Sequence, residues 1–249
     1  MEIVILCALG VGGATMLGAI FGFVFRSITH KCSDAVLSFA AGVSFAAAVI
    51  GLILPSIESG GKYGFIITVL GIFSGAVCVN LLDKAVPLAH KFVGLGSGKE
   101  LDGRTGRILV FVMAMAIHNL PEGIAAGVGF GSDDISAGIL IALGIAIQNV
   151  PEGMVIIAPM LSVGISPGRT LICALATGLV EVVGTFIGYY AVSLSEAILP
   201  FSLAFAGGTM LYVVSDDMIP ETHSHGNEHA ATYALLAGFS LMLVFSVLL

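Results

Sequence analysis

The sequence predicts an all-α integral membrane protein with eight transmembrane helices. Hydrophobic residues make up 57% of the 249 residues, charged residues only 10%, and the mean hydropathy is +1.08. A water-soluble domain could not cover this much apolar surface with polar side chains, so we expect the lipid bilayer to be its solvent. Since a spanning helix needs about 20 apolar residues, eight of them leave no room for a separate soluble domain. We therefore expect residues 1–249 to form a single transmembrane domain.

Apolar runs separated by polar or Gly/Pro clusters indicate where the eight helices lie. They fall near residues 3–25, 34–57, 63–82, 107–129, 135–161, 170–192, 198–220 and 230–249. The first run lacks the basic leading region and small-residue cleavage site of a secretory signal, so we expect it to be retained as a helix. The longest connection, about 83–106, combines basic residues with glycines, and we predict a flexible basic loop.

Basic residues predict the orientation, because lysine and arginine stay in cytoplasmic loops. If the N-terminus is outside the cell, eight of them fall in inner connections: Arg26, Lys31, Lys84, Lys91, Lys99, Arg104, Arg107 and Arg169. Only Lys62 then lies outside. This split favours an extracellular or periplasmic N-terminus and a cytoplasmic basic loop.

Charge and cysteine content exclude several other classes. The formal net charge of −7 is mild, and the nine basic residues form no stripe that could neutralise nucleic-acid phosphates, so we exclude nucleic acid as a partner. The four cysteines have no CxxC spacing and are expected to behave as small hydrophobic residues. No ATP-binding motif appears, and no cofactor is expected.

One internal repeat points to a site. HNLPEG at 118–123 is followed thirty residues later by QNVPEG at 148–153, in two successive and therefore antiparallel helices. Paired, proline-interrupted helices in transporters with inverted repeats usually mark the substrate site near the middle of the membrane. Because positions i and i+4 share a helix face, each segment forms one polar cluster. The clusters contain His118, Asn119 and Glu122 in the first segment and Gln148, Asn149 and Glu152 in the second.

These side chains suit a divalent metal ion. An ionised carboxylate at the bilayer centre costs at least about 2.5–3.5 kcal/mol, so Glu122 and Glu152 need a compensating cation. With one imidazole nitrogen and amide oxygens, the set suits zinc, iron, manganese, cobalt or cadmium better than copper(I). A single Asn or Gln in a membrane helix is more often an interhelical hydrogen bond. Two such segments in register nevertheless favour a functional ion site.

Other polar residues are weaker candidates. Glu181 is a lone carboxylate deep in the sixth helix, and we expect it to bind metal, although burial could instead keep it protonated. Asp217 lies at the cytoplasmic end of the seventh helix and is a candidate for the ion pathway. His223 and His225 follow in a short inner loop, which could collect a released metal loosely or form an ordinary solvated turn.

The repeat and the Gly178-Leu-Val-Glu181 segment resemble the signatures of the fourth, fifth and sixth helices in the ZIP (Zrt-/Irt-like protein) family of metal transporters. The resemblance extends over essentially the whole chain and is nearest to short prokaryotic members. It implies transport of divalent metal cations, zinc above all, toward the cytoplasm. It also implies a 3+2+3 inverted-repeat bundle with both termini outside, in the inner membrane of a bacterium or archaeon.

The resemblance further implies a binuclear metal site. One centre would consist of His118, Glu122, Gln148 and Glu152, and a neighbouring one of Asn119, Asn149 and Glu181 with shared glutamates. The first, fourth, fifth and sixth helices would rock as a block against the others. Ser44 stands where some relatives have a metal-facing methionine, so a thioether contact is missing and the preference could shift toward harder ions. Asp216-Asp217 replaces the His-Glu pair of many members.

Two functions from other classes remain as alternatives. An intramembrane metallohydrolase would need an HExxH motif, but Asn119 takes the place of its general base, so we do not expect an enzyme. A proton-coupled carrier of an organic solute would normally have a basic or aromatic substrate cradle, and the deep helices contain no lysine or arginine. The sequence leaves open which metal is physiological and whether the protein forms a homodimer.

Overall fold

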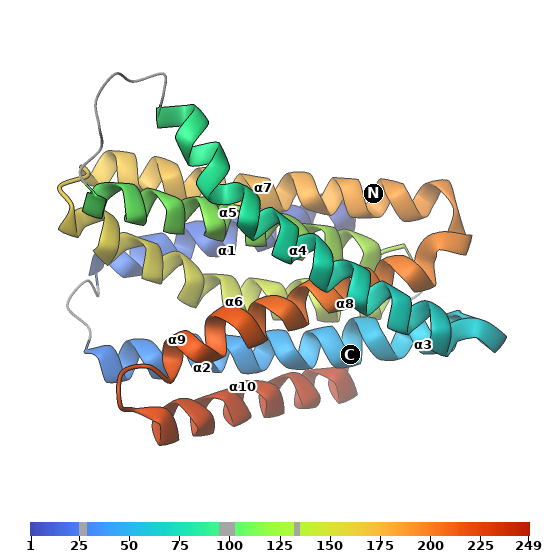
Figure 1. The fold of residues 1–249 in the computed structure, drawn as a ribbon. Coiled ribbons are helices and arrows are strands. Elements are labelled where there is room, and N and C mark those ends of the chain that lie inside the picture. The colour runs from blue at the N-terminus through green and yellow to red at the C-terminus, as the bar shows by residue number, and fades with distance from the viewer. Residues whose placement is uncertain (25–28, 95–102, 132–134) are drawn as a thin grey trace.

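The computed structural model describes residues 1–24, 29–94, 103–131 and 135–249, and within them every regular element is a helix (Figure 1). Eight helical rods follow one another along the chain. They are α1 (Glu2–Val24); α2 (His30–Ala46), continued by the π-helix η1 (Ala47–Ile53) and α3 (Leu54–Ser59); α4 (Gly64–Gly94); α5 (Gly103–Gly129); α6 (Ile135–Ser162); α7 (Pro167–Leu194); α8 (Leu199–Val213), continued by the π-helix η4 (Val214–Met218) and α9 (Ile219–Thr222); and α10 (Glu228–Leu248). Single-turn 3₁₀ helices η2 (Gly61–Tyr63) and η3 (Glu196–Ile198) precede α4 and α8.

The eight predicted helices are confirmed, with ends within a few residues except in one place. The third was expected to end near residue 82, whereas α4 continues to Gly94 and α5 begins at Gly103, so much of the predicted loop 83–106 is helical. Hydropathy marks where a chain leaves the apolar region, but a helix satisfies its own backbone groups and can extend beyond that point. Residues 95–102, with Lys99, and residues 25–28, with Arg26, lie outside the described residues.

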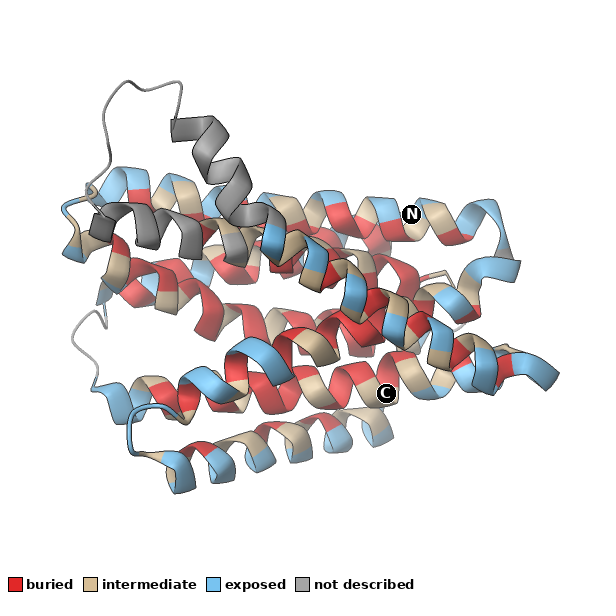
Figure 2. Ribbon diagram, viewed as in Figure 1, coloured by how far each residue is buried: buried red, intermediate tan, exposed pale blue. Residues whose placement is uncertain are grey.

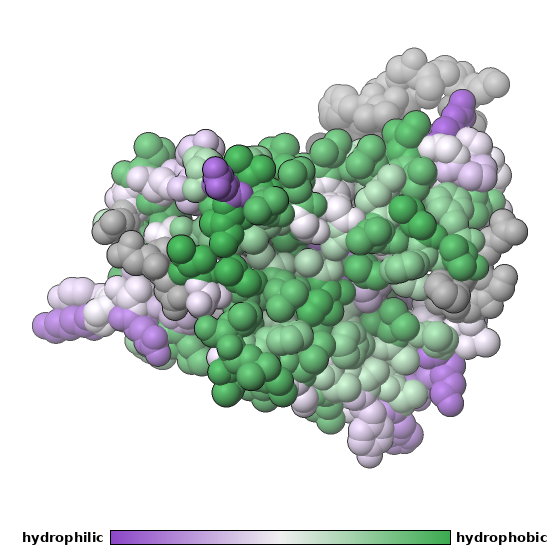
Figure 3. All heavy atoms as spheres, turned by 180° about the vertical axis from the view of Figure 1, so that it is seen from behind, coloured by the Kyte–Doolittle hydropathy of each residue, from purple (hydrophilic) through white to green (hydrophobic). Residues whose placement is uncertain are grey.

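Six of the described helices are long and apolar enough to cross a membrane. Their outward faces carry exposed apolar side chains, among them Leu6, Leu70 and Leu236. Figure 2 shows the buried residues gathered where the helices face one another, whereas α10 keeps most of its surface exposed. Seen from behind, hydrophobic residues cover the middle of the molecule and hydrophilic ones gather toward its two ends (Figure 3). This is the surface pattern of a protein that a bilayer surrounds.

The rods form two groups. Helices α1, α5, α6 and α7 pack against one another, and we call them the site bundle. The α2–α3 rod, α4, the α8–α9 rod and α10 also pack together, and we call them the frame bundle. The two bundles meet mainly where α2 and η1 contact α6 and where α5 contacts α8 and α4.

Glycines let helices within each bundle approach to backbone contact. A methyl group on Gly153 of α6 would meet the Thr15 carbonyl of α1, and one on Gly42 of α2 would meet the Leu235 carbonyl of α10. Small residues are the usual means of close packing between membrane helices. At the junction between the bundles, the neighbours of Gly144 are instead the side chains of Met242 and Ala47.

Both chain termini lie toward one end of the molecule (Figure 1). The opposite end holds the start of α2, the end of α6 and the turn from α9 into α10. Because η4, which contains Asp217, lies near that turn, we call this end of the molecule the Asp217 end.

Candidate metal centre

Helices α5 and α6 carry the two repeated segments through the interior. Both are continuous across their prolines, Pro121 in α5 and Pro151 in α6. A proline has no amide hydrogen, so the carbonyl groups of Ile117 and Ile147 cannot make their usual helical hydrogen bonds. Each segment therefore has one backbone carbonyl without its usual helical donor, one residue before the segment begins.

The structure brings the two segments face to face. The Nε2 of Gln148 donates a hydrogen bond of 2.6 Å to Oε1 of Glu122. Both side chains are buried, and so are Asn119, Asn149 and Glu152. The polar faces expected from the i, i+4 spacing thus meet inside the site bundle.

Glu181 of α7 joins the same cluster and is completely buried. Its two carboxylate oxygens accept hydrogen bonds from the Thr15 hydroxyl at 2.8 Å and from Nδ2 of Asn149 at 2.6 Å. Asn149 also donates to the backbone carbonyl of Val11 at 3.1 Å. Three helices of the site bundle therefore hold this carboxylate. Sequence reasoning missed Thr15, because a threonine in an apolar helix is ordinary and no motif surrounds it.

Several oxygens of the cluster have no hydrogen-bond donor. Among the described residues, five buried side-chain polar atoms lack a partner, and one of these is Ser38 Oγ. The other four are Asn119 Oδ1, Glu122 Oε2, Gln148 Oε1 and Asn149 Oδ1. Leaving a buried polar group unpaired costs about 1–3 kcal/mol, so four in one cluster need a reason. All four are oxygen acceptors, which is what a bound cation requires of its ligands.

A cavity of about 620 Å³ leads from this cluster to the Asp217 end. At its inner part it is lined by His118, Glu122 and Glu152. Asp216, Asp217 and Glu221 line it farther along, on η4 and α9. Glu181 does not line this cavity, so the cluster has an open side at Glu122 and Glu152 and a closed side at Glu181.

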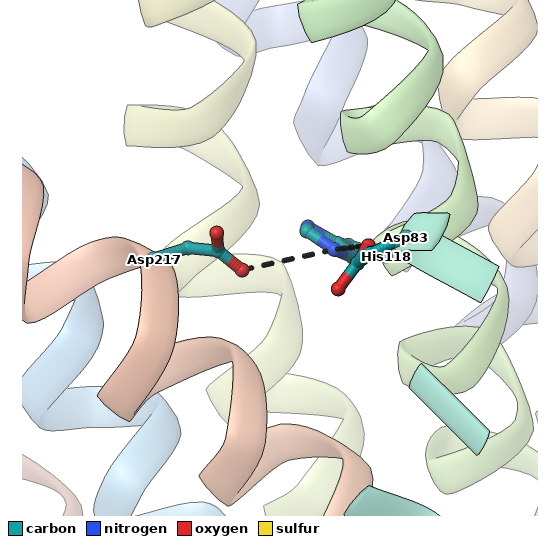
Figure 4. A group of neighbouring side chains, drawn as sticks. All are labelled: Asp83, His118 and Asp217. Carbon is teal, nitrogen blue, oxygen red and sulfur yellow. Dashed lines mark hydrogen bonds and ion pairs between the residues drawn. The ribbon is translucent and has the colours of Figure 1, made fainter. Parts of the chain in front are cut away.

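His118 lies between the two bundles. Its Nε2 is 2.9 Å from an oxygen of Asp83 on α4 and 3.7 Å from an oxygen of Asp217 on η4 (Figure 4). Ligand atoms of the three residues lie within 4.8 Å of one another, which is close enough to hold one metal ion. Sequence reasoning missed Asp83. It lies just past the predicted end at residue 82, where a charged residue is common, so only the fold shows that it faces His118.

The remaining candidates lie elsewhere. Ser44 is buried in α2 and does not line this cavity. His223 bonds locally, to the carbonyl of Ile219 and to the hydroxyls of Thr222 and Thr232. His225 turns away from it and pairs with Asp34 at 3.0 Å. The structure thus joins Asp217 to the central cluster through His118, but not Ser44 or His223.

Fold and site together define a class: a multi-pass membrane protein with a buried cluster of carboxylate, amide and imidazole side chains and a cavity leading from them to one end. Comparison with known proteins gives the family. The family model described as "ZIP Zinc transporter" matches residues 95–246. The chain belongs to this family of transporters.

Relatives match over nearly the whole chain. This chain is 37% identical to the protein named Zinc transporter GufA of Myxococcus xanthus, over 94% of this chain and 93% of that protein. It is 38% identical to Zinc transporter ZIPB of Bordetella bronchiseptica, over 92% of this chain and 76% of the relative. Human Zinc transporter ZIP11 is 32% identical, over 94% of each chain. The resemblance to the ZIP family that the repeated segments predict is thereby confirmed.

Proposed function

We propose that this protein carries divalent metal cations, zinc first among them, across the membrane toward the cytoplasm. The observation that carries the proposal is the group of four buried oxygens without donors, on Asn119, Glu122, Gln148 and Asn149. Two of their side chains bond to the buried carboxylates of Glu122 and Glu181, which a bilayer would otherwise penalise. The three relatives named above are all called zinc transporters, which favours zinc among the metals that suit these side chains.

We assign the ligands to two neighbouring centres. His118, Glu122, Gln148 and Glu152 form one, while Asn119, Asn149 and Glu181 complete the other with shared glutamates. Gln148 now directs its NH₂ group at Glu122, and a half-turn of the amide would present its unpaired Oε1 to a metal instead. Because the two centres lack thiolate ligands, we expect them to bind metal with moderate affinity. A carrier needs moderate affinity in order to release the ion.

Topology and direction follow from the basic residues. Since lysines and arginines favour the cytoplasmic side, the Asp217 end faces the cytoplasm and both termini lie outside. The helices then form a 3+2+3 inverted repeat within one transporter domain, 1–249, and the basic segment 83–106 lies inside. Bacterial relatives support placement in an inner membrane. The cavity that reaches Glu122 and Glu152 from the Asp217 end is then the release path.

Release would pass through His118. This residue belongs to the site bundle, whereas Asp83 and Asp217 belong to the frame bundle. Rocking of the site bundle would therefore change the distance between His118 and the two aspartates. We infer that His118 takes part in the central site and in transfer of the ion toward the cytoplasm. The proposal includes neither an enzymatic reaction nor a resident cofactor.

The test is metal flux in sealed vesicles containing the purified protein. Zinc, cadmium, iron, manganese and cobalt are offered in turn, and at least one should accumulate. Glu122→Ala and Glu152→Ala should reduce uptake to that of vesicles without protein, because each removes a charged ligand. Glu58→Ala, which removes an exposed carboxylate of α3, is the matched control and should transport normally. Unchanged flux in both ligand variants would refute the proposed path.

A further inference from the structure

One hydrogen bond joins α4 to α8 within the frame bundle, beside the proposed release path. The Nδ2 of Asn80 on α4 donates to the Tyr212 hydroxyl on α8 at 2.7 Å, and both side chains are half-buried. The two helices do not need this bond in order to associate. Gly75 of α4 and Gly208 of α8 already bring them to backbone contact, because a methyl group on either would meet a carbonyl of the other helix. The hydrogen bond therefore has another use.

Asn80 and Tyr212 each lie one helical turn from an aspartate that contacts His118. Asn80 is three residues before Asp83 on α4, and residues three apart share a helix face. Tyr212 is five residues before Asp217, which belongs to the π-helix η4. Five residues make about one turn where the hydrogen bonds join i to i+5. The Asn80–Tyr212 bond thus lies one turn away from the aspartates on both rods.

The aspartates need a fixed spacing because one nitrogen atom reaches both of them. Nε2 of His118 lies 2.9 Å from Asp83 and 3.7 Å from Asp217, between α4 and η4 (Figure 4). Asn80 and Tyr212 span the same two rods directly, whereas the aspartates are joined only through His118 of the site bundle. The Asn80–Tyr212 bond therefore sets the width of the gap that His118 enters.

Charge makes this support necessary. His118 attracts Asp217, whereas Asp83 and Asp216 repel it. The Tyr212 hydroxyl lies close enough to the carboxylates of Asp83 and Asp216 to interact with both. When the site bundle moves and takes His118 away, the like charges on α4 and η4 would push the rods apart. A neutral bond between two residues of the frame bundle persists through that motion.

We propose that Tyr212, held by Asn80, is a positioning residue for metal release, because it keeps Asp83 and Asp217 at the spacing that His118 requires. The inference rests on the proposed function, transport of a divalent metal past His118. Tyr212 neither binds the metal nor belongs to the central cluster. It acts through the two aspartates.

Zinc uptake by vesicles that contain the Tyr212→Phe protein tests this proposal. The change removes the hydroxyl and keeps the ring. The maximal rate should fall about three- to tenfold, as the loss of one hydrogen bond allows, while the half-saturating zinc concentration stays the same because the central side chains are untouched. Asn80→Ala should give the same result from the other side of the bond, even if Tyr212→Phe fails to fold. Tyr233→Phe, at a position of α10 that is 75% exposed, is the matched control and should transport normally.

A second background, Asp83→Ala with Asp217→Ala, separates positioning from a purely structural tie. Because Tyr212 acts through these aspartates, Tyr212→Phe should cause no further loss of rate there. A tyrosine that only stabilises the frame bundle would lower the rate by the same factor in both backgrounds, and that result would overturn the proposal. A full maximal rate in both Tyr212→Phe and Asn80→Ala would overturn it as well and leave the proposed function intact. Wild-type vesicles that accumulate no metal would overturn both.

Discussion

Helices within a bundle are joined differently from helices that meet between the two bundles. In the site bundle, α6 meets α1 at Gly153 and α5 meets α7 at Gly123, each so closely that an added methyl group would strike a backbone atom. The frame bundle is joined in the same way at Gly42, and it is also tied by the Ser56 hydroxyl, which contacts Thr68 and the Pro200 carbonyl at 2.7 Å each. Between the bundles, an added methyl group would meet side chains instead: those of Met242 and Ala47 at Gly144 and that of Ile141 at Gly51. Backbone contacts thus join the helices within each bundle, whereas at these two glycines side chains separate the bundles, as the proposed rocking of the site bundle requires.

The buried polar side chains of the central cluster also belong almost entirely to one of the two bundles. Glu122, Glu152 and Glu181 all belong to the site bundle, and their neighbours Gln148, Asn149 and Thr15 do as well. His118 is the exception, because its hydrogen bond and ion pair reach Asp83 and Asp217 of the frame. A metal bound by these glutamates would therefore move with the site bundle and would leave it where His118 contacts the frame bundle.

The largest effect should come from locking the two bundles together. A β-carbon on Gly144 would lie 3.1 Å from that of Ala47, so a small displacement would allow a disulfide between Ala47→Cys and Gly144→Cys. The four native cysteines are replaced first so that no other pair can form. Oxidation should stop zinc uptake in vesicles, and reduction should restore it, while zinc binding persists in both states. Uptake that continues in fully crosslinked protein would show that the bundles need not move.

Adding a methyl group to a glycine should lower the free energy of unfolding more within a bundle than between the two bundles. Gly153→Ala places it against the Thr15 carbonyl inside the site bundle, where backbone atoms cannot yield. We expect a loss of about 1–3 kcal/mol in the free energy of unfolding, as for overpacked cores. Gly144→Ala meets the flexible end of Met242 and should cost less. Melting temperatures in detergent measure both, and an equal or reversed order would contradict the distinction.

Thr15→Val should weaken metal binding while keeping the shape of the side chain. The hydroxyl donates to Glu181 at 2.8 Å, and its loss leaves a buried carboxylate oxygen with one donor fewer. We expect the zinc concentration for half-maximal uptake to rise about tenfold, equivalent to about 1.4 kcal/mol. Thr177→Val is the control, since within the described part of the chain this buried hydroxyl of α7 bonds to the Ala174 carbonyl of its own helix. Equal responses of the two variants would remove Thr15 from the site.

Asp217→Asn should have the smallest effect. Its side chain is 46% exposed and lies 3.7 Å from His118, so solvent screens the interaction. We expect the maximal rate of zinc uptake to fall about threefold with little change in the half-saturating concentration, because the variant impairs release and not central binding. Glu228→Gln, at an exposed position in the first turn of α10, should leave the rate unchanged. A large change in half-saturation would place Asp217 in the central site instead.

The fold was largely predictable from the sequence. Eight apolar runs predicted the helices, six of which are long and apolar enough to cross a membrane. The i, i+4 spacing predicted one polar face on α5 and one on α6, and the hydrogen bond between Gln148 and Glu122 shows that these faces meet. The extent of α4 was not predictable from hydropathy, because Gly94 lies beyond the apolar run but within the helix.

The buried polar cluster was predictable where a pattern repeats and, for Glu181, where a lone carboxylate interrupts an apolar helix. The paired HNLPEG and QNVPEG segments marked six residues, whereas Thr15, Asp83 and Asp34 stand alone in the sequence and gain partners only when distant helices come together. His225 was named as a loose collector in an inner loop, but its pairing with a buried carboxylate of α2 has no local signal. Contacts between residues far apart in the chain need the fold.

Anomalous X-ray diffraction from zinc-soaked crystals, recorded at the zinc absorption edge, tests the central claim most directly. We expect a peak between α5 and α6, within bonding distance of carboxylate oxygens of Glu122 and Glu152, at about 2.0–2.2 Å from each. Zinc peaks elsewhere in the protein with none between these two glutamates, at a saturating zinc concentration, would contradict it.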